Sequence, residues 1–329
     1  MNQKLLEYDR ELFARELETF IPRTVFDAHA HIYNISHFKG DIPKCCSGGP
    51  NSVGCLEIER ELAALMPRRN ISGLFFGFPA VGLDFEAANL FTADEAHHDP
   101  RSRAHMLVHP SMDPEQVRET VRSDGFVGLK CYHLWSSEQP TLNASIPSFL
   151  TEEHVRVAHE EGLSITLHIV RDRSIDDASN QSVIRRYAER YPRARFILAH
   201  AARGFNSYHA SLGMGSLKGL RNVWCDTSAV TESGALEVAI RTLGVDRLLY
   251  GSDFPVSHER GRCVTIGDSF MWLSAENARF DSGFRTVKPT LVGIEALRAL
   301  KLACWNLRLG DSEVEAIFYG NAASLFSLY

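Results

Sequence analysis

Residues 24–31 read TVFDAHAH, a largely apolar run that ends in two histidines separated by one residue. A run that is hydrophobic at most positions is typical of a β-strand covered on both faces. Seven further runs share this character, and the full set covers residues 24–29, 71–78, 104–109, 126–131, 164–169, 195–200, 222–227 and 247–251. Eight strands that alternate with helices over roughly 230 residues predict a closed (β/α)8 barrel, a TIM barrel, of the α/β class.

The segments between these runs carry residues that begin and end helices. Asp113 precedes a proline in the first turn of one segment, and Gly125 closes it. Thr151 and Gly162 bracket the next helical segment in the same way. We therefore expect each of these segments to cross over from one parallel strand to the next.

The chain is expected to form one domain, residues 1–329. An N-terminal helix is predicted in residues 1–22, the barrel in 23–290 and additional C-terminal helices in 291–329. Ser312 and Glu315 have the spacing of a capping box in that last segment.

Composition excludes several classes of protein. Of the 329 residues, 44% are hydrophobic and 23% are charged, as in ordinary globular domains. No apolar run approaches about 18 residues, so no membrane span is expected, and the N-terminus lacks the apolar core of a signal peptide. The net charge of -6 argues against nucleic acid as a partner. Seven scattered cysteines favour a reducing cytoplasm over a disulfide framework.

Polar residues concentrate at the ends of the predicted strands, where barrel enzymes place their active sites. These residues are His29, His31, Lys130, His168, His200 and Asp253. Side chains two residues apart on a strand point the same way, roughly 7 Å apart, so His29 and His31 can reach one ion. Imidazoles combined with a carboxylate suit zinc, manganese or iron. The pattern predicts a metal site.

Six motifs carry a family resemblance over about Thr24 to Phe326. FDAHAH, LHIVRD, ILAHAARG, VWCDTSA, LLYGSDFP and IFYGNAASLF occur in this order. The set resembles the amidohydrolase superfamily, and most closely its amidohydrolase-related branch. That branch includes decarboxylases of the aminocarboxymuconate semialdehyde and resorcylate type, and lactonases. The resemblance implies a distorted barrel with a divalent metal, zinc or alternatively manganese, and one ion is favoured over two. The implied ligands are His29, His31, His168 and Asp253, with His200 as the general acid/base or carbonyl-polarising group.

Two reactions are consistent with this resemblance. The first is hydrolysis of a small carboxylate-bearing amide, lactone or related compound by a metal-activated water, whose proton Asp253 takes. The alternative is metal-dependent decarboxylation of an aromatic or unsaturated acid. Other branches of the superfamily place a carboxylated lysine at the end of the fourth strand, where it bridges two metals. Lys130 occupies that place here, although in the more similar branch such a lysine is usually not a ligand, and it could instead bind a substrate carboxylate.

Cations follow three of the strand ends. Arg171 and Arg173 come after His168, Arg203 comes after His200, and Arg260 and Arg262 come after Asp253. They indicate either an anionic substrate or a solvated rim neutralised by residues such as Asp172 and Asp176. We expect a small anionic substrate, and a homo-oligomer such as the dimers or tetramers of this branch. The expected substrate-binding residues are Lys130, Arg171, Arg203, Trp135 and His258.

Two further aspartates are interpreted as supporting residues. Asp226, at the end of the seventh strand, is expected to hold a ligand histidine. Asp27 shares the strand parity of the two histidines and is expected to support the barrel.

Overall fold

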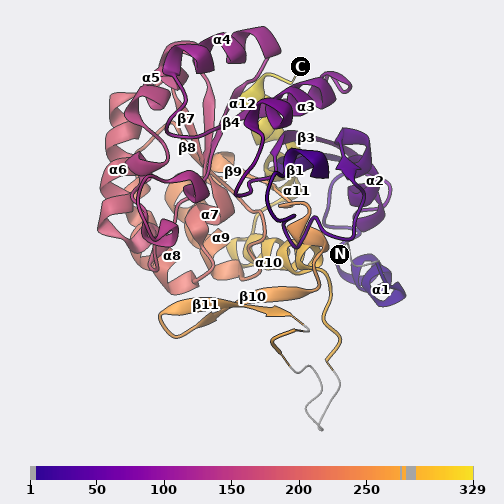
Figure 1. Ribbon diagram of the computed structural model, residues 1–329. Coiled ribbons are helices and arrows are strands. Elements are labelled where there is room, and N and C mark those ends of the chain that lie inside the picture. Colours follow the sequence, from indigo (N-terminus) through magenta and orange to yellow (C-terminus); the bar gives the residue numbers. More distant parts are fainter. Residues whose placement is uncertain (1–4, 275, 279–286, 329) are drawn as a thin grey trace.

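The computed structural model of the protein describes residues 5–274, 276–278 and 287–328. A parallel sheet forms the centre of the molecule (Figure 1). Among these residues eight strands pair in parallel in chain order. They are β1 (Thr24–Asn34), β3 (Asn70–Gly77), β4 (Arg103–Val108), β5 (Gly128–Cys131), β6 (Ser164–Leu167), β7 (Arg195–Leu198), β8 (Val223–Asp226) and β9 (Leu248–Leu249). A two-residue strand, β2 (Ser52–Val53), pairs antiparallel with the end of β1.

The residues that follow β9 close the sheet against β1. Ala28 donates its backbone N–H to Tyr250 at 2.8 Å, Asp253 donates to His29 at 2.8 Å, and His31 donates to Phe254 at 2.9 Å. The predicted distorted (β/α)8 barrel is therefore confirmed. The distortion lies at this seam, because β9 has only two regular residues and the chain beyond it follows β1 through separate hydrogen bonds.

An irregularity in β1 decides which of its side chains face the barrel interior. Phe26 and Ala28 belong to an interior apolar cluster to which β3, β7, β8 and β9 also contribute. The register of β1 with β3 shifts between Asp27 and Ala30. Beyond the shift His29 and His31 also face inward, and both rings contact Phe76, at centroid distances of 5.0 and 4.8 Å. The prediction that Asp27 points to the same side of the strand as His29 and His31 is therefore wrong. The bulge between them breaks the two-residue alternation of side chains.

Asp27 supports the closed barrel, as predicted. Its Oδ1 accepts the backbone N–H groups of His29 at 3.0 Å and Ser252 at 2.8 Å, which ties β1 to the seam. Burial raises the pKa of Asp27 to about 7, although the hydrogen bonds from Ser252 and His29 oppose this rise.

Helices surround the sheet, and the first and last regular elements of the chain are also helices (Figure 1). They are α1 (Glu7–Glu16), α2 (Cys55–Leu65), α3 (Phe85–His97), α4 (Pro114–Asp124), α5 (Glu152–Glu161), α6 (Ala178–Arg190), α7 (Ala199–Arg203), α8 (Ser207–Gly213), α9 (Ser233–Leu243), α10 (Val292–Leu307), α11 (Asp311–Glu315) and α12 (Asn321–Phe326). Asp113 and Thr151 cap α4 and α5 as predicted, and Gly125 and Gly162 end them with left-handed φ angles of 73° and 68°.

The predicted capping box in the C-terminal segment is wrong by two residues. Helix α11 begins at Asp311, and Glu313 accepts the backbone N–H of Gly310 at 2.8 Å. Ser312 and Glu315 therefore lie within the helix and not at its start.

A hairpin of β10 (Gly261–Ile266) and β11 (Ser269–Ser274) extends beside α9 and α10 (Figure 1). Its turn is fixed by Asp268, which pairs with Arg173 at 2.6 Å and with His209 of α8 at 2.8 Å. Phe270 and Trp272 of β11 pack on Phe205, at centroid distances of 5.1 and 5.5 Å. The hairpin is thus joined to the loops that follow β6 and β7.

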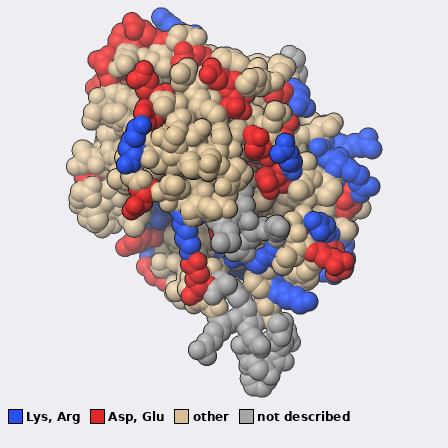
Figure 2. Space-filling view, turned by 45° about the vertical axis from the view of Figure 1, so that its right-hand side comes forward, with Lys and Arg blue, Asp and Glu red and all other residues tan. Residues whose placement is uncertain are grey.

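Acidic and basic side chains are interspersed over the face shown in Figure 2. Many charged side chains of the described residues form ion pairs: Arg118 of α4, for example, lies 2.7 Å from Glu161 of α5. Among the described residues, no helix combines the length and apolarity needed to cross a membrane.

Candidate metal centre

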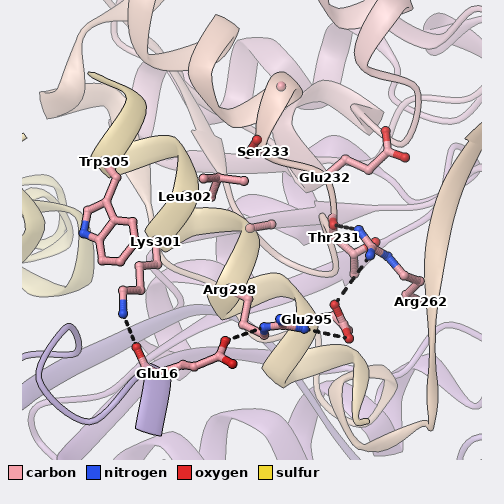
Figure 3. A pocket seen from close by; sticks show the side chains of 12 residues that line it. Glu16, Thr231, Glu232, Ser233, Arg262, Glu295, Arg298, Lys301, Leu302 and Trp305 are labelled. Atoms are coloured by element: carbon pink, nitrogen blue, oxygen red, sulfur yellow. Dashed lines mark hydrogen bonds and ion pairs between the residues drawn. The ribbon is translucent and has the colours of Figure 1, made fainter. Parts of the chain in front are cut away.

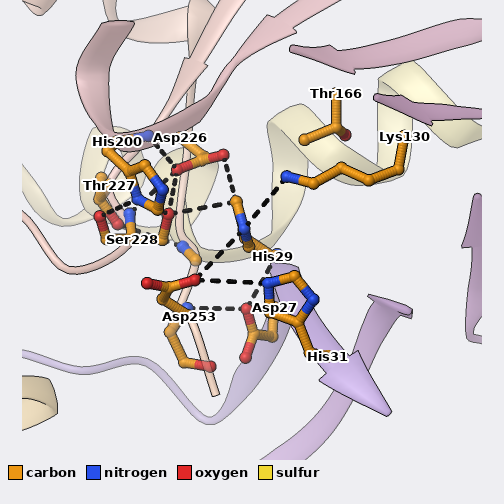
Figure 4. Close-up of polar contacts among 12 residues, drawn as sticks. Asp27, His29, His31, Lys130, Thr166, His200, Asp226, Thr227, Ser228 and Asp253 are labelled. Atoms are coloured by element: carbon orange, nitrogen blue, oxygen red, sulfur yellow. Dashed lines mark hydrogen bonds and ion pairs between the residues drawn. The ribbon is translucent and has the colours of Figure 1, made fainter. Parts of the chain in front are cut away.

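Six polar side chains from different strand ends meet inside the mouth of the barrel (Figure 4). They are His29 and His31 on β1, Lys130 on β5, His200 just after β7, Asp226 at the end of β8, and Asp253 in the seam after β9. None of these residues is more than 8% exposed. Ionisable groups are rarely buried this completely unless they are paired or bind a cation.

The carboxylate of Asp253 lies between two imidazoles. Its Oδ1 is 3.3 Å from Nε2 of His29 and 3.7 Å from Nε2 of His31. One nitrogen or oxygen atom from each of His29, His200 and Asp253 also lies within 4.8 Å of the others. These atoms are close enough for a single cation to bind all three.

The outer nitrogens of three imidazoles are held by hydrogen-bond acceptors. Nδ1 of His29 lies 2.9 Å from the Asp226 carboxylate, Nδ1 of His31 lies 3.1 Å from the Gly77 carbonyl, and Nδ1 of His200 lies 2.9 Å from the Ser228 carbonyl. A carbonyl or an ionised carboxylate can only accept, so each Nδ1 carries the proton and each Nε2 keeps its lone pair. Histidines that bind metals in proteins are oriented in this way, so the residues fit a divalent metal.

Charge in the centre is compatible with metal binding. Burial lowers the pKa of His29 to about 3, with a further contribution from the Lys130 charge, so the imidazole is neutral at physiological pH. Burial alone would raise the pKa of Asp253, but the neighbouring His200, His31 and His29 hold it below the ordinary value. Neutral imidazoles and an ionised carboxylate are the forms that metals bind.

His168 lies beside this group and outside the set of three that shares the 4.8 Å distance. Its buried ring is 5.0 Å from the His200 ring and 4.6 Å from the Tyr132 ring, and its Nδ1 has no hydrogen-bond partner among the described residues. Burial, together with the neighbouring His200 and Arg203, lowers the pKa of His168 well below its ordinary value. Its role as a ligand remains a prediction.

Lys130 lies within the centre and not at its rim. The side chain is fully buried, and Nζ is 3.4 Å from Nε2 of His29 and 4.6 Å above the Phe76 ring. Burial lowers the pKa of Lys130 to about 8. The amine therefore contacts a candidate metal ligand directly.

A left-handed turn positions His200 and Arg203. The φ angles of residues 200–203 are 57°, 49°, 56° and 56°, although none of the four is glycine. Such a conformation costs L-residues roughly 1–2 kcal/mol each, and strain of this kind clusters at functional sites. The predicted strand 195–200 therefore ends early, at Leu198. Arg203 also lies near the mouth, because its charge acts on the buried His168 ring.

Arg203 differs from the other cations near the mouth because none of the described residues forms an ion pair with it, and the charge of Asp172 acts on it only from beyond ion-pair distance. Its Nε is buried without a hydrogen-bond partner, and its guanidinium lies 5.3 Å over the Phe270 ring. The other four have acidic partners: Arg171 with Asp177 at 3.4 Å, Arg173 with Asp176 and Asp268, Arg260 with Asp9 at 2.7 Å, and Arg262 with Glu295 at 3.8 Å.

The remaining two predicted substrate-binding residues have protein partners. Trp135 donates its indole N–H to the Ala80 carbonyl at 3.3 Å. His258 has Nε2 3.7 Å from Glu61 of α2 and Nδ1 3.1 Å from the Ser257 hydroxyl. Both ring nitrogens of His258 are thus occupied by the protein.

Ser228 was not predicted from the sequence. Its hydroxyl contacts Asp226 and the Nδ1 atoms of His29 and His200. The available signal was its place in CDTSA, two residues beyond Asp226 and therefore toward the same side of the chain.

A cavity of about 600 Å³ lies apart from the histidines, between α10, the start of α9 and β10 (Figure 3). Its charged side chains neutralise one another: Arg298 contacts Glu16 at 2.8 Å and Glu295 at 3.4 Å. This pairing leaves the histidine cluster as the candidate site for chemistry.

Comparison with known proteins identifies the family. The amidohydrolase family model matches residues 26–328. The chain belongs to this family, as the six motifs predict, and it is an enzyme of that family. A sequence search of curated proteins found no match.

Three solved structures illustrate the range of similar folds. An amidohydrolase from Burkholderia multivorans with bound zinc has a TM-score of 0.59 at 14% identity, covering 93% of this chain and 100% of that chain. A probable 2-pyrone-4,6-dicarboxylic acid hydrolase from Acinetobacter baumannii has a TM-score of 0.58 at 14% identity, covering 92% and 99%. A 2,6-dihydroxybenzoate decarboxylase from Rhizobium has a TM-score of 0.54 at 14% identity, covering 94% and 99%. At this identity the likeness shows the shared fold.

Proposed function

We propose that this enzyme is a metal-dependent hydrolase that acts on a small carboxylate-bearing amide, lactone or related compound. The observation that carries the proposal is the position of Arg203, a cation that forms no ion pair with any described residue, on the same turn as His200. A substrate carboxylate would satisfy this cation and lie beside the candidate metal ligands.

The residues proposed to hold the metal are His29, His31, His168 and Asp253. A donor set rich in imidazole nitrogen suits zinc, and the similar Burkholderia multivorans protein binds zinc, with manganese as the alternative. When bound, such a cation lowers the pKa of water to about 7 and polarises a substrate oxygen.

Proton transfer is assigned to two side chains. Asp253 is ionised and adjacent to His29 and His31, so its carboxylate can accept a proton and return it to a leaving group. Nε2 of His200 is proposed to hold the substrate oxygen or to exchange a proton with it, because the Ser228 carbonyl fixes Nδ1 as the donor on the other side.

The second candidate is decarboxylation of an aromatic or unsaturated acid on the same metal. Its support is the aromatic surroundings of the acid/base residue: the His200 ring stacks on Phe205 at 5.2 Å, and Phe205 contacts Trp272 of the hairpin. A planar acid would find similar contacts there. The shared fold of the Rhizobium decarboxylase agrees with this alternative.

Product analysis in ¹⁸O-labelled water separates the two reactions. The panel contains a pyrone dicarboxylate, amides of aromatic acids and a dihydroxybenzoate. We expect turnover of a lactone or amide with one labelled oxygen in the new carboxylate of the product. Release of carbon dioxide, with no label in the organic product, would overturn the hydrolase proposal in favour of the decarboxylase.

Arg203→Gln should raise KM for the carboxylate substrate roughly 10- to 100-fold, because a charge-assisted hydrogen bond is lost. Arg203→Lys should recover part of this loss, since the charge returns without the bidentate guanidinium. Arg186→Gln, at an exposed position on α6, is the control and should leave KM unchanged. Steady-state kinetics of the four proteins provides the measurement, and an unchanged KM in Arg203→Gln would remove Arg203 from substrate binding.

A further inference from the structure

We propose that Asp226 and Ser228 are positioning residues that together set the proton positions on both His29 and His200. This inference rests on the proposed function, because it assigns the two residues to the proposed metal ligand and to the proposed acid/base group. Neither residue needs to touch the substrate.

Asp226 connects the two histidines through its two oxygens. Its side chain is completely buried at the end of β8. Oδ2 lies 2.9 Å from Nδ1 of His29, and Oδ1 accepts the backbone N–H groups of His200 at 2.9 Å and Ser228 at 3.1 Å (Figure 4). One carboxylate therefore orients the His29 ring and also fixes the backbone from which the His200 ring extends.

The Ser228 hydroxyl extends this control to the His200 ring. It has one proton, which it donates to Oδ1 of Asp226, because a carboxylate at that short contact can only accept. The lone pairs of Oγ then face Nδ1 of His29 at 3.2 Å and Nδ1 of His200 at 2.9 Å, where Oγ joins the Ser228 carbonyl, also at 2.9 Å, as a second acceptor. With its own proton committed, Oγ can only accept from these nitrogens.

These contacts allow only one position for the proton on each of the two imidazoles. Both Nδ1 atoms carry hydrogen, and both Nε2 atoms keep a lone pair. The proton positions on His29 and His200 are thus coupled through two buried side chains.

Asp226→Asn changes the proton positions with little change in side-chain shape. The amide oxygen is expected at the Oδ1 position, because three donors point there. The amide NH2 group then faces Nδ1 of His29 and forces that nitrogen to become the acceptor. His29 must move its proton to Nε2, where a metal needs a lone pair. A tautomer reversed in this way disables a histidine without moving it.

The experiment reads tautomers and metal affinity separately. In metal-free wild-type protein, ¹⁵N NMR of the imidazoles should show Nδ1 protonated on His29 and His200. Asp226→Asn should show His29 protonated at Nε2, and its zinc affinity, measured by competition with a chelating dye, should fall roughly 10- to 100-fold. Ser228→Ala should shift the Nδ1 resonance of His200, and Ser228→Thr, which retains the hydroxyl, should restore it.

Thr227→Val is the matched control. It removes a neighbouring buried hydroxyl, which accepts the Gly251 backbone N–H at 3.1 Å and, within the described part of the chain, forms no hydrogen bond with either histidine. It should lower stability without changing either tautomer or the zinc affinity. Wild-type tautomers and affinity in both Asp226→Asn and Ser228→Ala would overturn the inference. If wild-type protein binds no metal, the proposed function fails, and the tautomer measurement still decides the inference.

Discussion

Asp253→Asn is expected to lower kcat by about 10²- to 10⁴-fold, the range that a general acid/base contributes. The carboxylate lies 3.3 Å from Nε2 of His29 and 3.7 Å from Nε2 of His31, at the centre of the cluster. An amide of the same shape cannot accept the proton, and it binds a cation more weakly than a carboxylate does.

The fold should survive this substitution because the structural contact of Asp253 comes from its backbone. Its N–H donates to the His29 carbonyl at 2.8 Å across the barrel seam, and asparagine retains that bond. Asparagine also tolerates the left-handed φ of 61° at this position. Circular dichroism should therefore be unchanged. Asp246→Asn, an exposed aspartate beside Arg247, is the control for loss of a carboxylate. Full turnover in Asp253→Asn would remove this residue from the mechanism.

Removal of the metal with a chelator is expected to abolish turnover, and addition of zinc should restore it. Elemental analysis of the purified protein should find one divalent ion per chain. Two ions per chain would instead favour the bridging alternative for Lys130, whose Nζ already contacts His29. Chelation should also lower the Tm, because a cation that binds only the folded state stabilises it by about 2.7 kcal/mol at a hundredfold excess over Kd.

Loss of activity on chelation must be separated from loss of fold. Circular dichroism of the chelated enzyme at 25 °C provides this control, since it detects the helices that surround the sheet. If the purified enzyme contains no metal and turns over in the presence of a chelator, both the hydrolase and the decarboxylase mechanisms proposed for it are wrong.

The barrel could be predicted because its strands are hydrophobic at nearly every position, a pattern that only burial on both faces explains. The hairpin of β10 and β11 was not predicted, and its residue Arg262 was interpreted only as a cation that follows Asp253. A signal was present, since Gly267-Asp268 separates two short runs of strand-forming residues. The hairpin was missed because it lies outside the regular alternation of strands and helices from which the barrel was predicted.

The candidate site was predictable as a set of residue types but not in its detailed geometry. Residues at strand ends must converge in any parallel barrel, which is why His29, His200 and Asp253 could be grouped. The sequence could not show that Arg171 forms an ion pair with Asp177 whereas Arg203 forms none with the described residues, because pairing depends on loop conformation. The sequence also could not show the left-handed turn, because residues 199–203 (AHAAR) include no glycine, the residue that usually marks such a conformation.

The left-handed turn at residues 200–203 allows the side chain at 203 to change without a change in the position of His200. The conformation of residues 200–203 is a property of the backbone, stabilised in part by the Gly204 N–H, which donates to the His200 carbonyl at 2.6 Å. The side chain at 203 can therefore change in descendants of this gene while the imidazole at 200 stays where it is. Exchange of residue 203 is therefore expected to change which substrates bind, while the role proposed for His200 is retained.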